Sequence, residues 1–325
     1  MNYEFLIMNF FVTLQSIMRK IVWIIATICL LVGCGQSYEE TQRKTRQQQR
    51  ELQRQDSAAL KIAVMPTMDC MPLYVALERG FFKKQGIDVR LRRYTAQMDC
   101  DTAIERGRVE GIVSDLVRTE RMQQLGTKLH YMAATDAYWL LVTNRMARIR
   151  ELNQLDDKML AMTRYSATDM LTTAAVDSAK LKAERVYRIQ INDVNVRLAM
   201  LIGNEMDAMW LTEPQATAAR QQRHRIIMDS RKLDLQLGVL AFSQNAMDNE
   251  KRKKQIDAFE KAYKQAIDSL AKHGLKNYRD IAIKYCNITP SVADTLNKTI
   301  KYKKPVEPRQ EDIEKVQRWL KTTNL

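Results

Sequence analysis

Hydrophobic and polar residues alternate over residues 60–65 and the pattern stops at Pro66, which predicts a short strand followed by a break. Further strands are predicted over residues 87–91 and 109–113. Helices are predicted between the strands, over residues 73–79 and 101–106, and each is closed by a glycine. Strands and helices that alternate at this spacing predict right-handed crossovers and a parallel sheet.

A second series of the same kind follows the first. Strands are predicted over residues 138–143, 159–162, 186–191 and 206–211, and helices over residues 169–178 and 194–202. A strand over residues 237–242 then returns to the first series. Helices fill the remainder, with apolar positions at helical spacing at Ile256, Phe259, Tyr263, Ile267 and Leu270. The pattern predicts an α/β protein with one lobe of residues 59–142 and 237–325 and a second lobe of residues 143–236.

The amino terminus has the pattern of an export signal. Arg19 and Lys20 precede an apolar run over residues 21–32, which is too short to span a bilayer and suits a signal peptide. The run leads into the sequence LVGC at residues 31–34, which resembles the box of bacterial lipoproteins. Cys34 is therefore expected to carry lipid and to become the first residue of the mature protein.

This prediction divides the first part of the chain in two. Residues 1–33 are a signal peptide, and residues 34–58, which have almost no apolar side chain, are a polar tether that can fluctuate into exposed helix. We expect the protein in the cell envelope, anchored to a membrane by lipid and facing the periplasm or the exterior. The alternative is an uncleaved anchor over residues 5–32. The sequence leaves open whether the chain starts at Met1 or at Met18.

The charge of the chain suggests a nucleic-acid partner until it is located. The 325 residues carry a formal net charge of +14. Residues 251–325 hold 18 Lys and Arg against 9 Asp and Glu, so most of the excess belongs to the predicted C-terminal helices. Basic residues are not interleaved with aromatic ones, and an exported protein does not meet nucleic acid. We therefore expect no nucleic-acid partner and interpret the charge as a solvated helical face.

The sequence also lacks the motifs of several enzyme classes. It contains no G-x-G-x-x-G, no phosphate-binding P-loop and no H-E-x-x-H pair. Its three histidines, His130, His224 and His273, are far apart along the chain. The composition thus favours a protein that is not an enzyme, with no cofactor and no metal.

Three blocks resemble a known family. The segment PLYVALERGFFKKQGIDV at residues 72–89 is similar to the opening segment of type II periplasmic solute-binding proteins. Within them it most resembles the branch that serves sulfonates, nitrate and thiamine pyrimidine precursors. The segments GRVEGIVSD at residues 107–115 and GNEMDA at residues 203–208, followed by Glu213 and Pro214, resemble later blocks. The similarity runs in order over the predicted lobes and is weaker in the terminal helices.

The resemblance implies a two-lobed α/β fold with a hinge and a ligand cleft between the lobes. It also implies a monomeric receptor that captures a small molecule by lobe closure and delivers it to the permease and ATPase subunits of an ABC importer. The pattern of strands points to the same cleft, because ligands of open α/β sheets bind at the carboxyl ends of the strands. Closure about a hinge is a common way to bury a small solute.

Candidate ligand-binding residues follow the predicted strands or begin the predicted helices. They are Asp69, Cys70, Met71, Gln97, Asp99, Cys100, Ser114, Asp115, Tyr138, Tyr165, Ser166, Thr168, Asp169, Trp210 and Glu213. Backbone N–H groups at the helix start after Tyr165 can hold an anion or a carbonyl oxygen. Two alternatives stay open: Ser166 and Thr168 can simply cap their own helix, and Trp139 can be a core residue.

The triplet Met-Asp-Cys occurs twice, at residues 68–70 and 98–100. If both triplets are loops after neighbouring strands, Cys70 and Cys100 can form a disulfide in an exported protein. Two alternatives remain. The thiolates can join Asp69 and Asp99 in a site for a soft metal, or the two thiols are free and have no joint role.

Carboxylates dominate the predicted cleft, with Arg164 as the nearest cation. They are Asp69, Asp99, Asp101, Asp115, Asp136, Asp169 and Glu213. This count disfavours a bare sulfonate or nitrate and favours an amine or a pyrimidine-like ligand.

Two other functions are weighed against the transport receptor. One is an enzyme similar to the thiamine-pyrimidine synthases, and the other is the ligand-binding subunit of a membrane sensor.

Overall fold

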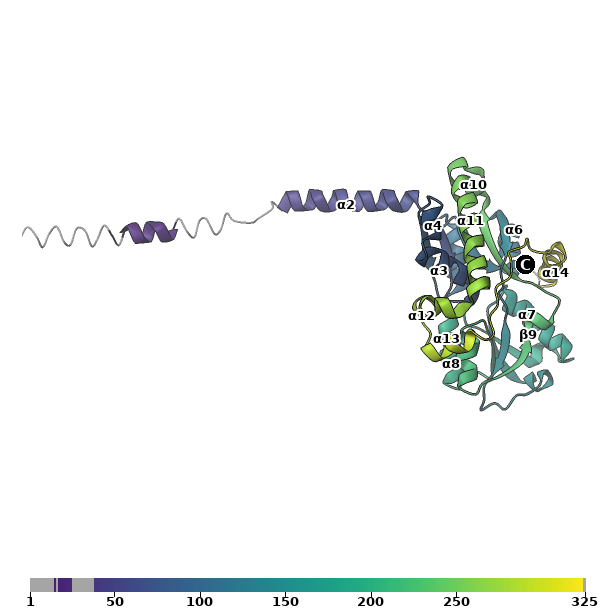
Figure 1. Ribbon diagram of the computed structural model, residues 1–325. Helices are drawn as coiled ribbons and strands as arrows, with labels where there is room; N and C mark the ends of the chain where they lie inside the picture. The colour runs from purple at the N-terminus through teal and green to yellow at the C-terminus, as the bar shows by residue number, and fades with distance from the viewer. Residues whose placement is uncertain (1–14, 16, 25–37, 324–325) are drawn as a thin grey trace, which may run out of the picture. The chain divides into compact units, whose positions relative to one another are not determined.

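The computed structural model describes residues 15, 17–24 and 38–323, and the chain divides into two compact units, residues 1–57 and 58–325 (Figure 1). In this part of the chain no helix is both long enough and apolar enough to cross a membrane. Cys34 and most of the predicted signal peptide lie outside the described residues.

Helix α2 (Tyr38–Ala58) occupies most of the predicted polar tether. Side chains four residues apart contact each other along it, Arg46 with Gln42 and Gln55 with Glu51. The helix is rich in Gln, Arg and Glu, which are strong helix formers. The segment is therefore a regular helix, where the sequence suggested a tether that only fluctuates into one.

The first sheet has the strand order β2-β1-β3-β10-β4. Its strands are β1 (Leu60–Val64), β2 (Val89–Arg93), β3 (Gly111–Asp115), β4 (Leu129–Ala134) and β10 (Gly238–Ser243). Strand β1 is parallel to β2 and β3, whereas β10 is antiparallel to β3 and β4. The predicted parallel arrangement is confirmed for β1, β2 and β3, and the sheet as a whole is mixed because β10 enters it from the opposite direction when the chain returns.

The second sheet has the strand order β7-β6-β8-β5-β9. Its strands are β5 (Leu140–Thr143), β6 (Lys158–Met162), β7 (Val186–Gln190), β8 (Ala208–Leu211) and β9 (Arg225–Asp229). Strand β6 is parallel to β7 and β8, and β5 is antiparallel to β8 and β9. Strand β5 pairs in this sheet although it straddles the predicted lobe boundary after residue 142.

Helices cover both sheets (Figure 1). They are α3 (Met71–Glu78), α4 (Phe81–Lys84), α5 (Gln97–Glu105), α6 (Leu116–Gln124), α7 (Ala167–Ser178), α8 (Val194–Ile202), α9 (Gln215–Gln221), α10 (Gln244–Asp248), α11 (Glu250–His273), α12 (Arg279–Cys286), α13 (Pro290–Leu296) and α14 (Gln310–Thr322). Gly80 and Gly107 close α3 and α5 with left-handed backbone, as the sequence predicts.

Helix α11 buries the apolar face that its spacing predicts. Ile256, Phe259, Tyr263, Ile267 and Leu270 are all buried. The ring of Phe259 lies 5.3 Å from that of Phe82 and 5.4 Å from that of Phe242, so the helix packs on α4 and on the first sheet.

Helix α14 packs on α6 at the side of the molecule where the two sheets approach each other. Val316 and Leu320 of α14 belong to one buried cluster with Leu116 and Val117 of α6. The same cluster includes Trp210 of the second sheet. Apolar packing therefore joins the two halves of the fold through these helices.

Three segments connect the two sheets or border them. Residues 135–139 and 230–237, here called the crossover segments, link β4 to β5 and β9 to β10. Residues 297–309, the C-terminal strap, join α13 to α14. The carbonyl oxygen of Val306 in the strap accepts a 2.7 Å hydrogen bond from the N–H of Ala134, so the strap covers the edge of β4.

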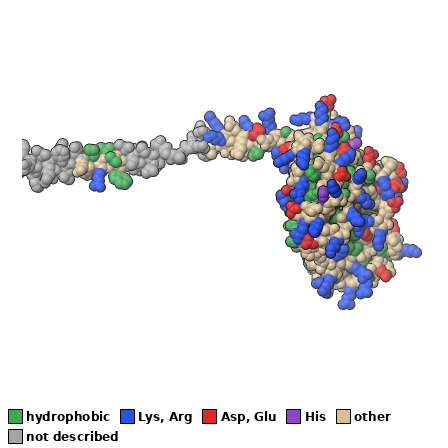
Figure 2. Space-filling model, in the orientation of Figure 1, with side chains coloured by type: hydrophobic (Ala, Val, Ile, Leu, Met, Phe, Trp, Pro, Cys, Tyr) green, Lys and Arg blue, Asp and Glu red, His purple; other side chains and the backbone are tan. Residues whose placement is uncertain are grey.

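Lys and Arg side chains are spread over the visible face of the protein and along α2, rather than gathered in one patch (Figure 2). Asp and Glu side chains are interspersed among them on the same face. This distribution is typical of a solvated surface and does not trace a stripe along which a nucleic-acid backbone would bind.

Candidate functional site

A cavity of about 80 Å³, here called the inter-sheet cavity, lies where the carboxyl ends of strands from both sheets face each other. Segments that follow β1, β3, β6 and β8 contribute most of its wall. The lining residues are Met65, Thr67, Asp69, Gln97, Val113, Ser114, Asp115, Arg118, Ala137, Trp139, Thr163, Ser166, Thr168, Asn192, Val194, Arg197, Trp210 and Thr212. Its position is the one at which open α/β sheets bind their ligands.

The structure brings together about half of the residues that the sequence singles out. Those that line the inter-sheet cavity are Asp69, Gln97, Ser114, Asp115, Ser166, Thr168 and Trp210. Those that do not are Cys70, Met71, Asp99, Cys100, Tyr138, Tyr165, Asp169 and Glu213. Trp139, for which core packing was an alternative, lines the cavity and is only partly buried.

Several of the outlying residues have partners elsewhere. The Tyr165 ring lies 4.5 Å from the guanidinium carbon of Arg121. Asp169 forms an ion pair of 2.7 Å with Arg188. Glu213 accepts a 2.8 Å hydrogen bond from the N–H of Thr217 at the start of α9. These side chains have partners within the protein and do not line the inter-sheet cavity.

The predicted disulfide between Cys70 and Cys100 is absent, and both residues are buried free thiols. The prediction assumed that both triplets were loops. Residues 68–70 instead form a 3-10 turn, and residues 98–100 lie in the first turns of α5. The Sγ atom of Cys70 accepts a 3.4 Å hydrogen bond from the N–H of Met65. Burial is the main reason why the pKa of each thiol is raised.

The soft-metal alternative also assumed that the two triplets converge. Among residues 15, 17–24 and 38–323, no group of three or more His, Cys, Asp or Glu side chains is arranged to hold a metal ion. Of the three alternatives for the cysteines, the structure matches that of two free thiols.

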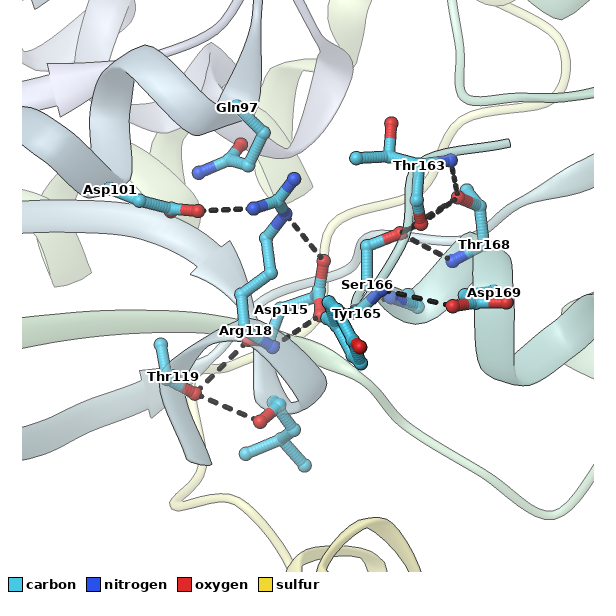
Figure 3. Close-up of polar contacts among 12 residues, drawn as sticks. Gln97, Asp101, Asp115, Arg118, Thr119, Thr163, Tyr165, Ser166, Thr168 and Asp169 are labelled. Atoms are coloured by element: carbon cyan, nitrogen blue, oxygen red, sulfur yellow. Dashed lines mark hydrogen bonds and ion pairs between the residues drawn. The ribbon is translucent and has the colours of Figure 1, made fainter. Parts of the chain in front are cut away.

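Asp115 joins the two halves of the fold (Figure 3). Its Oδ1 atom accepts a hydrogen bond of 3.0 Å from the N–H of Arg118, which caps α6, and another of 3.0 Å from the N–H of Ala167 at the start of α7. The carboxylate follows β3 of the first sheet, whereas α7 packs on the second. Burial raises the pKa of Asp115 to about 6, although the positive charge of Arg118 opposes the shift.

Arg118 is a cavity residue that the sequence analysis missed. It is only 6% exposed, donates a hydrogen bond to Asp101 and has its Nε atom 3.9 Å from the Asp115 carboxylate (Figure 3). Its Nε and Nη2 atoms have no hydrogen-bond partner within the described residues, and neither do the hydroxyls of Ser114 and Thr212. Buried polar groups are rarely left in this state.

Arg197 is the second arginine that the sequence analysis missed, and it is 5% exposed. Its guanidinium donates to the carbonyl oxygens of Ile191 at 2.6 Å and Trp210 at 3.2 Å, and to the hydroxyl of Thr163. It makes no ion pair with a carboxylate of the described chain. Burial lowers the pKa of Arg197 to about 9, and the positive charge of Arg118 adds to this effect.

The count of charges at the cavity therefore differs from the prediction. Of the seven carboxylates, only Asp69 and Asp115 line it, and two arginines join them. Arg164, the expected cation, is not a lining residue. The sequence contains a weak signal for each arginine. Arg118 follows the strand end at Asp115 by three residues, and Arg197 lies within the otherwise apolar helix VNVRLAMLI.

Ser166 and Thr168 hold the start of α7 in place. The Ser166 hydroxyl accepts a hydrogen bond of 3.1 Å from the N–H of Thr168 and donates one of 2.7 Å to the carbonyl of Thr163. The Thr168 hydroxyl accepts from the N–H of Thr163 at 2.9 Å. Their hydrogen bonds are thus used within the protein (Figure 3), as in the capping alternative.

Three solved structures with a similar fold are described as ligand-binding proteins or components. The ligand-binding component of an ABC-type import system from Staphylococcus aureus, with zinc bound, has a TM-score of 0.70 at 15% identity and covers 82% of this chain and 91% of its own. The alkanesulfonate-binding protein SsuA from Xanthomonas axonopodis pv. citri, bound to MOPS, has a TM-score of 0.70 at 14% identity, covering 82% and 92%. The periplasmic nitrate-binding protein NrtA from Synechocystis PCC 6803 has a TM-score of 0.66 at 15% identity, covering 78% and 74%.

These similarities confirm the predicted fold class, the α/β fold of two-lobed type II periplasmic binding proteins. Comparison with curated proteins finds no match. A family model described as NMT1/THI5 like matches residues 67–274. Because that match covers well over half of the chain and most residues of the inter-sheet cavity, the chain belongs to the NMT1/THI5-like family.

Proposed function

We propose that the protein is an extracytoplasmic, lipid-anchored receptor that captures a small solute between two lobes and delivers it to an ABC importer. The observation that carries the proposal is the set of unpartnered polar groups at the inter-sheet cavity: Nε and Nη2 of Arg118 and the hydroxyls of Ser114 and Thr212. Leaving such groups unpaired costs free energy, and a bound solute would supply their partners. Structural similarity to importer components supports the same function.

Lobe closure is the second part of the proposal, with lobes of residues 59–142 plus 237–325 and of residues 143–236. The cavity of about 80 Å³ is smaller than the 300–1,000 Å³ typical of ligand pockets, so a solute would enter an open form. The hydrogen bond from the Ala167 N–H to Asp115 would hold the lobes together after closure. The crossover segments are the natural hinge.

The lining favours a small planar solute with no net charge that both donates and accepts hydrogen bonds. Arg118 offers donors, and Asp69 offers an acceptor. The partly buried indole of Trp139 provides a flat apolar wall. A bare amine would meet two buried arginines, and a bare oxyanion would meet Asp69 and Asp115. Of the two ligand classes that the sequence suggested, the pyrimidine-like class fits and the simple amine does not.

The proposal assigns no catalytic role to the chain. A synthase that used cysteine chemistry would need reactive thiolates. Cys70 and Cys100 are instead buried, and burial raises the pKa of both thiols, which lowers the fraction of thiolate.

Thermal unfolding of the full-length chain tests the proposal. We expect cytosine, uracil or a thiamine-pyrimidine precursor to raise the melting temperature in proportion to the logarithm of its concentration, and taurine and nitrate to have little effect. The Ser114→Ala variant should bind the pyrimidine less tightly without loss of stability, because this hydroxyl has no partner in the free protein. Ser291→Ala, on α13 and outside the cavity, is the matched control.

A different result would contradict transport. If none of these solutes shifts the melting temperature but an added membrane sensor protein shifts it, the chain reports to a sensor instead. If taurine or nitrate shifts it most strongly, the receptor function stands and the ligand class is wrong.

A further inference from the structure

We propose that the protein has a second binding site, which takes an organic amine with an acidic group at its far end. The site is a cavity of about 750 Å³, here called the hinge cavity, between the crossover segments, helix α11 and the C-terminal strap. Its volume falls within the range typical of ligand pockets. It goes beyond the proposed function, because the unpartnered donors of the inter-sheet cavity do not line it.

Three carboxylates line the hinge cavity, and one of them, Asp234, pairs with Arg309. The other two are Asp69 and Asp136. Within the described chain neither forms an ion pair, although the Asp136 carboxylate accepts a 3.0 Å hydrogen bond from the backbone N–H of Lys303. Burial is the main reason why the pKa of both carboxyl groups is raised. A buried carboxylate without a counterion is costly, and an ammonium group placed between the two would supply the missing positive charge.

Three tyrosines complete the inner wall: Tyr138, Tyr263 and Tyr302. Tyr263 is only 2% exposed, and its hydroxyl forms no hydrogen bond with any described residue. Burial is the main cause that raises the pKa of Tyr263, and the negative charges of Asp69 and Asp136, which line the same cavity, add to it. An unpartnered hydroxyl that shares a cavity with two carboxylates can accept a hydrogen bond from an ammonium, and the rings favour its alkyl chain and its charge.

The hydroxyl of Tyr302 is already used. It donates a hydrogen bond of 2.9 Å to the carbonyl oxygen of Met68, which fixes the strap above the cavity. The guanidinium carbon of Arg231 lies 4.0 Å from the centre of the Tyr138 ring, and this arginine also pairs with Asp229. Of the three hydroxyls, only that of Tyr302 has a hydrogen-bond partner among the described residues, and of the other two tyrosines Tyr263 is the more deeply buried.

The rim of the hinge cavity has the opposite charge. Lys301, Lys303 and Lys304 of the C-terminal strap line it with exposed side chains. Arg309, which also lines it, is held by Asp234 and Asp312. An acidic interior with a basic rim fits a zwitterion whose ammonium points inward and whose carboxylate stays near the lysines. A bare anion would find no partner inside.

Isothermal titration of the full-length chain with three probes of matched length tests the charge pattern. The probes are δ-aminovalerate, pentylamine and valerate. We expect δ-aminovalerate to bind most tightly, pentylamine more weakly and valerate not at all. Equal binding of valerate, or no binding of either amine, would overturn the proposal.

Variants test the location. Tyr263→Phe should weaken δ-aminovalerate by about tenfold or more, the scale of a hydrogen bond to a charged group, while thermal stability is unchanged because the hydroxyl has no partner. Tyr187→Phe, on β7 and outside both cavities, is the matched control. Ser114→Ala should leave δ-aminovalerate binding unchanged. If Ser114→Ala lowers the affinity for δ-aminovalerate and Tyr263→Phe does not, the amine occupies the inter-sheet cavity and the second site does not exist. Failure of the pyrimidine test alone leaves this site unaffected.

Discussion

At the scale of single residues, Asp115 shows how a strand end becomes a link between two halves of a fold. One carboxylate oxygen caps α6 and also accepts from the first N–H of α7. A negative charge is favourable at both helix starts. The site that α7 offers to an anion is therefore filled by the protein's own carboxylate, which agrees with a ligand that is not an anion.

Asp115 also predicts a dependence of stability on pH. Its folded pKa of about 6 is above the ordinary value of 3.8, so the folded state holds a proton that the unfolded state has lost between these values. Stability from this group is greatest below about pH 4 and declines as pH rises to about 6, by about 3 kcal/mol. The Asp115→Asn variant can still accept both hydrogen bonds. Its free energy of unfolding, measured with urea, should therefore decline between pH 4 and pH 6 by about 3 kcal/mol less than that of the wild type. Identical pH profiles for the two proteins would show that the carboxyl does not titrate in this way.

The sequence could identify Asp115 and Ser114 but not the two arginines beside them. The former follow a strand, and chemistry at the carboxyl end of a strand can be read from the pattern. Arg118 and Arg197 lie in helices, where an arginine usually faces solvent. Each arginine is held by a partner far away in the sequence, Asp101 for Arg118 and Thr163 for Arg197, and no local pattern contains these contacts. The predicted local charge was therefore too acidic.

At the scale of elements, the pattern predicted the repeated strands and helices and missed those with weak periodicity. Helix α8 has the predicted bounds, and the α11 core is as expected. Strands β4 and β9 were not predicted, and both are edge strands of their sheets. Edge position alone does not explain this result, because β2 and β7 are also edge strands and were predicted. The start of α5 was mistaken for a loop because the apolar residues among Gln97 to Cys100 do not have helical spacing.

The cap of α7 gives a prediction for an element. Ser166→Ala removes the acceptor for the Thr168 N–H, and we expect a loss of about 1 kcal/mol in the free energy of unfolding, measured with urea. Pyrimidine affinity should change less than in Ser114→Ala, because the Ser166 hydrogen bonds are satisfied within the protein. Ser243→Ala, at the start of α10, removes an equivalent cap outside the inter-sheet cavity. A large loss of affinity in Ser166→Ala without loss of stability would instead make Ser166 a ligand contact.

At the scale of the whole molecule, the packing between the two sheets and the attachment of the chain to a membrane depend on different parts of the sequence. The cluster of α6, α14 and Trp210 joins the two sheets by apolar packing. The two-lobed fold class could be predicted because repeated strand, helix and strand units restrict the topology. The direction of β10 and the path of the C-terminal strap could not, since both depend on contacts between segments far apart in the sequence.

Membrane attachment is predicted to depend on one thiol. Cys34→Ala removes the sulfur that would carry lipid, so we expect the variant in the soluble fraction when cells are fractionated. The wild-type chain should sediment with membranes under the same conditions. Arg43→Ala, on α2, is a control that should remain with the membranes. If Cys34→Ala also remains there, the uncleaved anchor over residues 5–32 is the better account.

Asp69 lines both the inter-sheet cavity and the hinge cavity. A single carboxylate shared by two occupants makes their affinities thermodynamically linked, and linkage is reciprocal. An amine that pairs with the Asp69 carboxylate weakens the hydrogen bond that this carboxylate can accept from a pyrimidine. The factor by which δ-aminovalerate weakens the pyrimidine must then equal the factor by which the pyrimidine weakens δ-aminovalerate. Uptake of one solute would in this way be adjusted by the concentration of another, with no regulatory subunit.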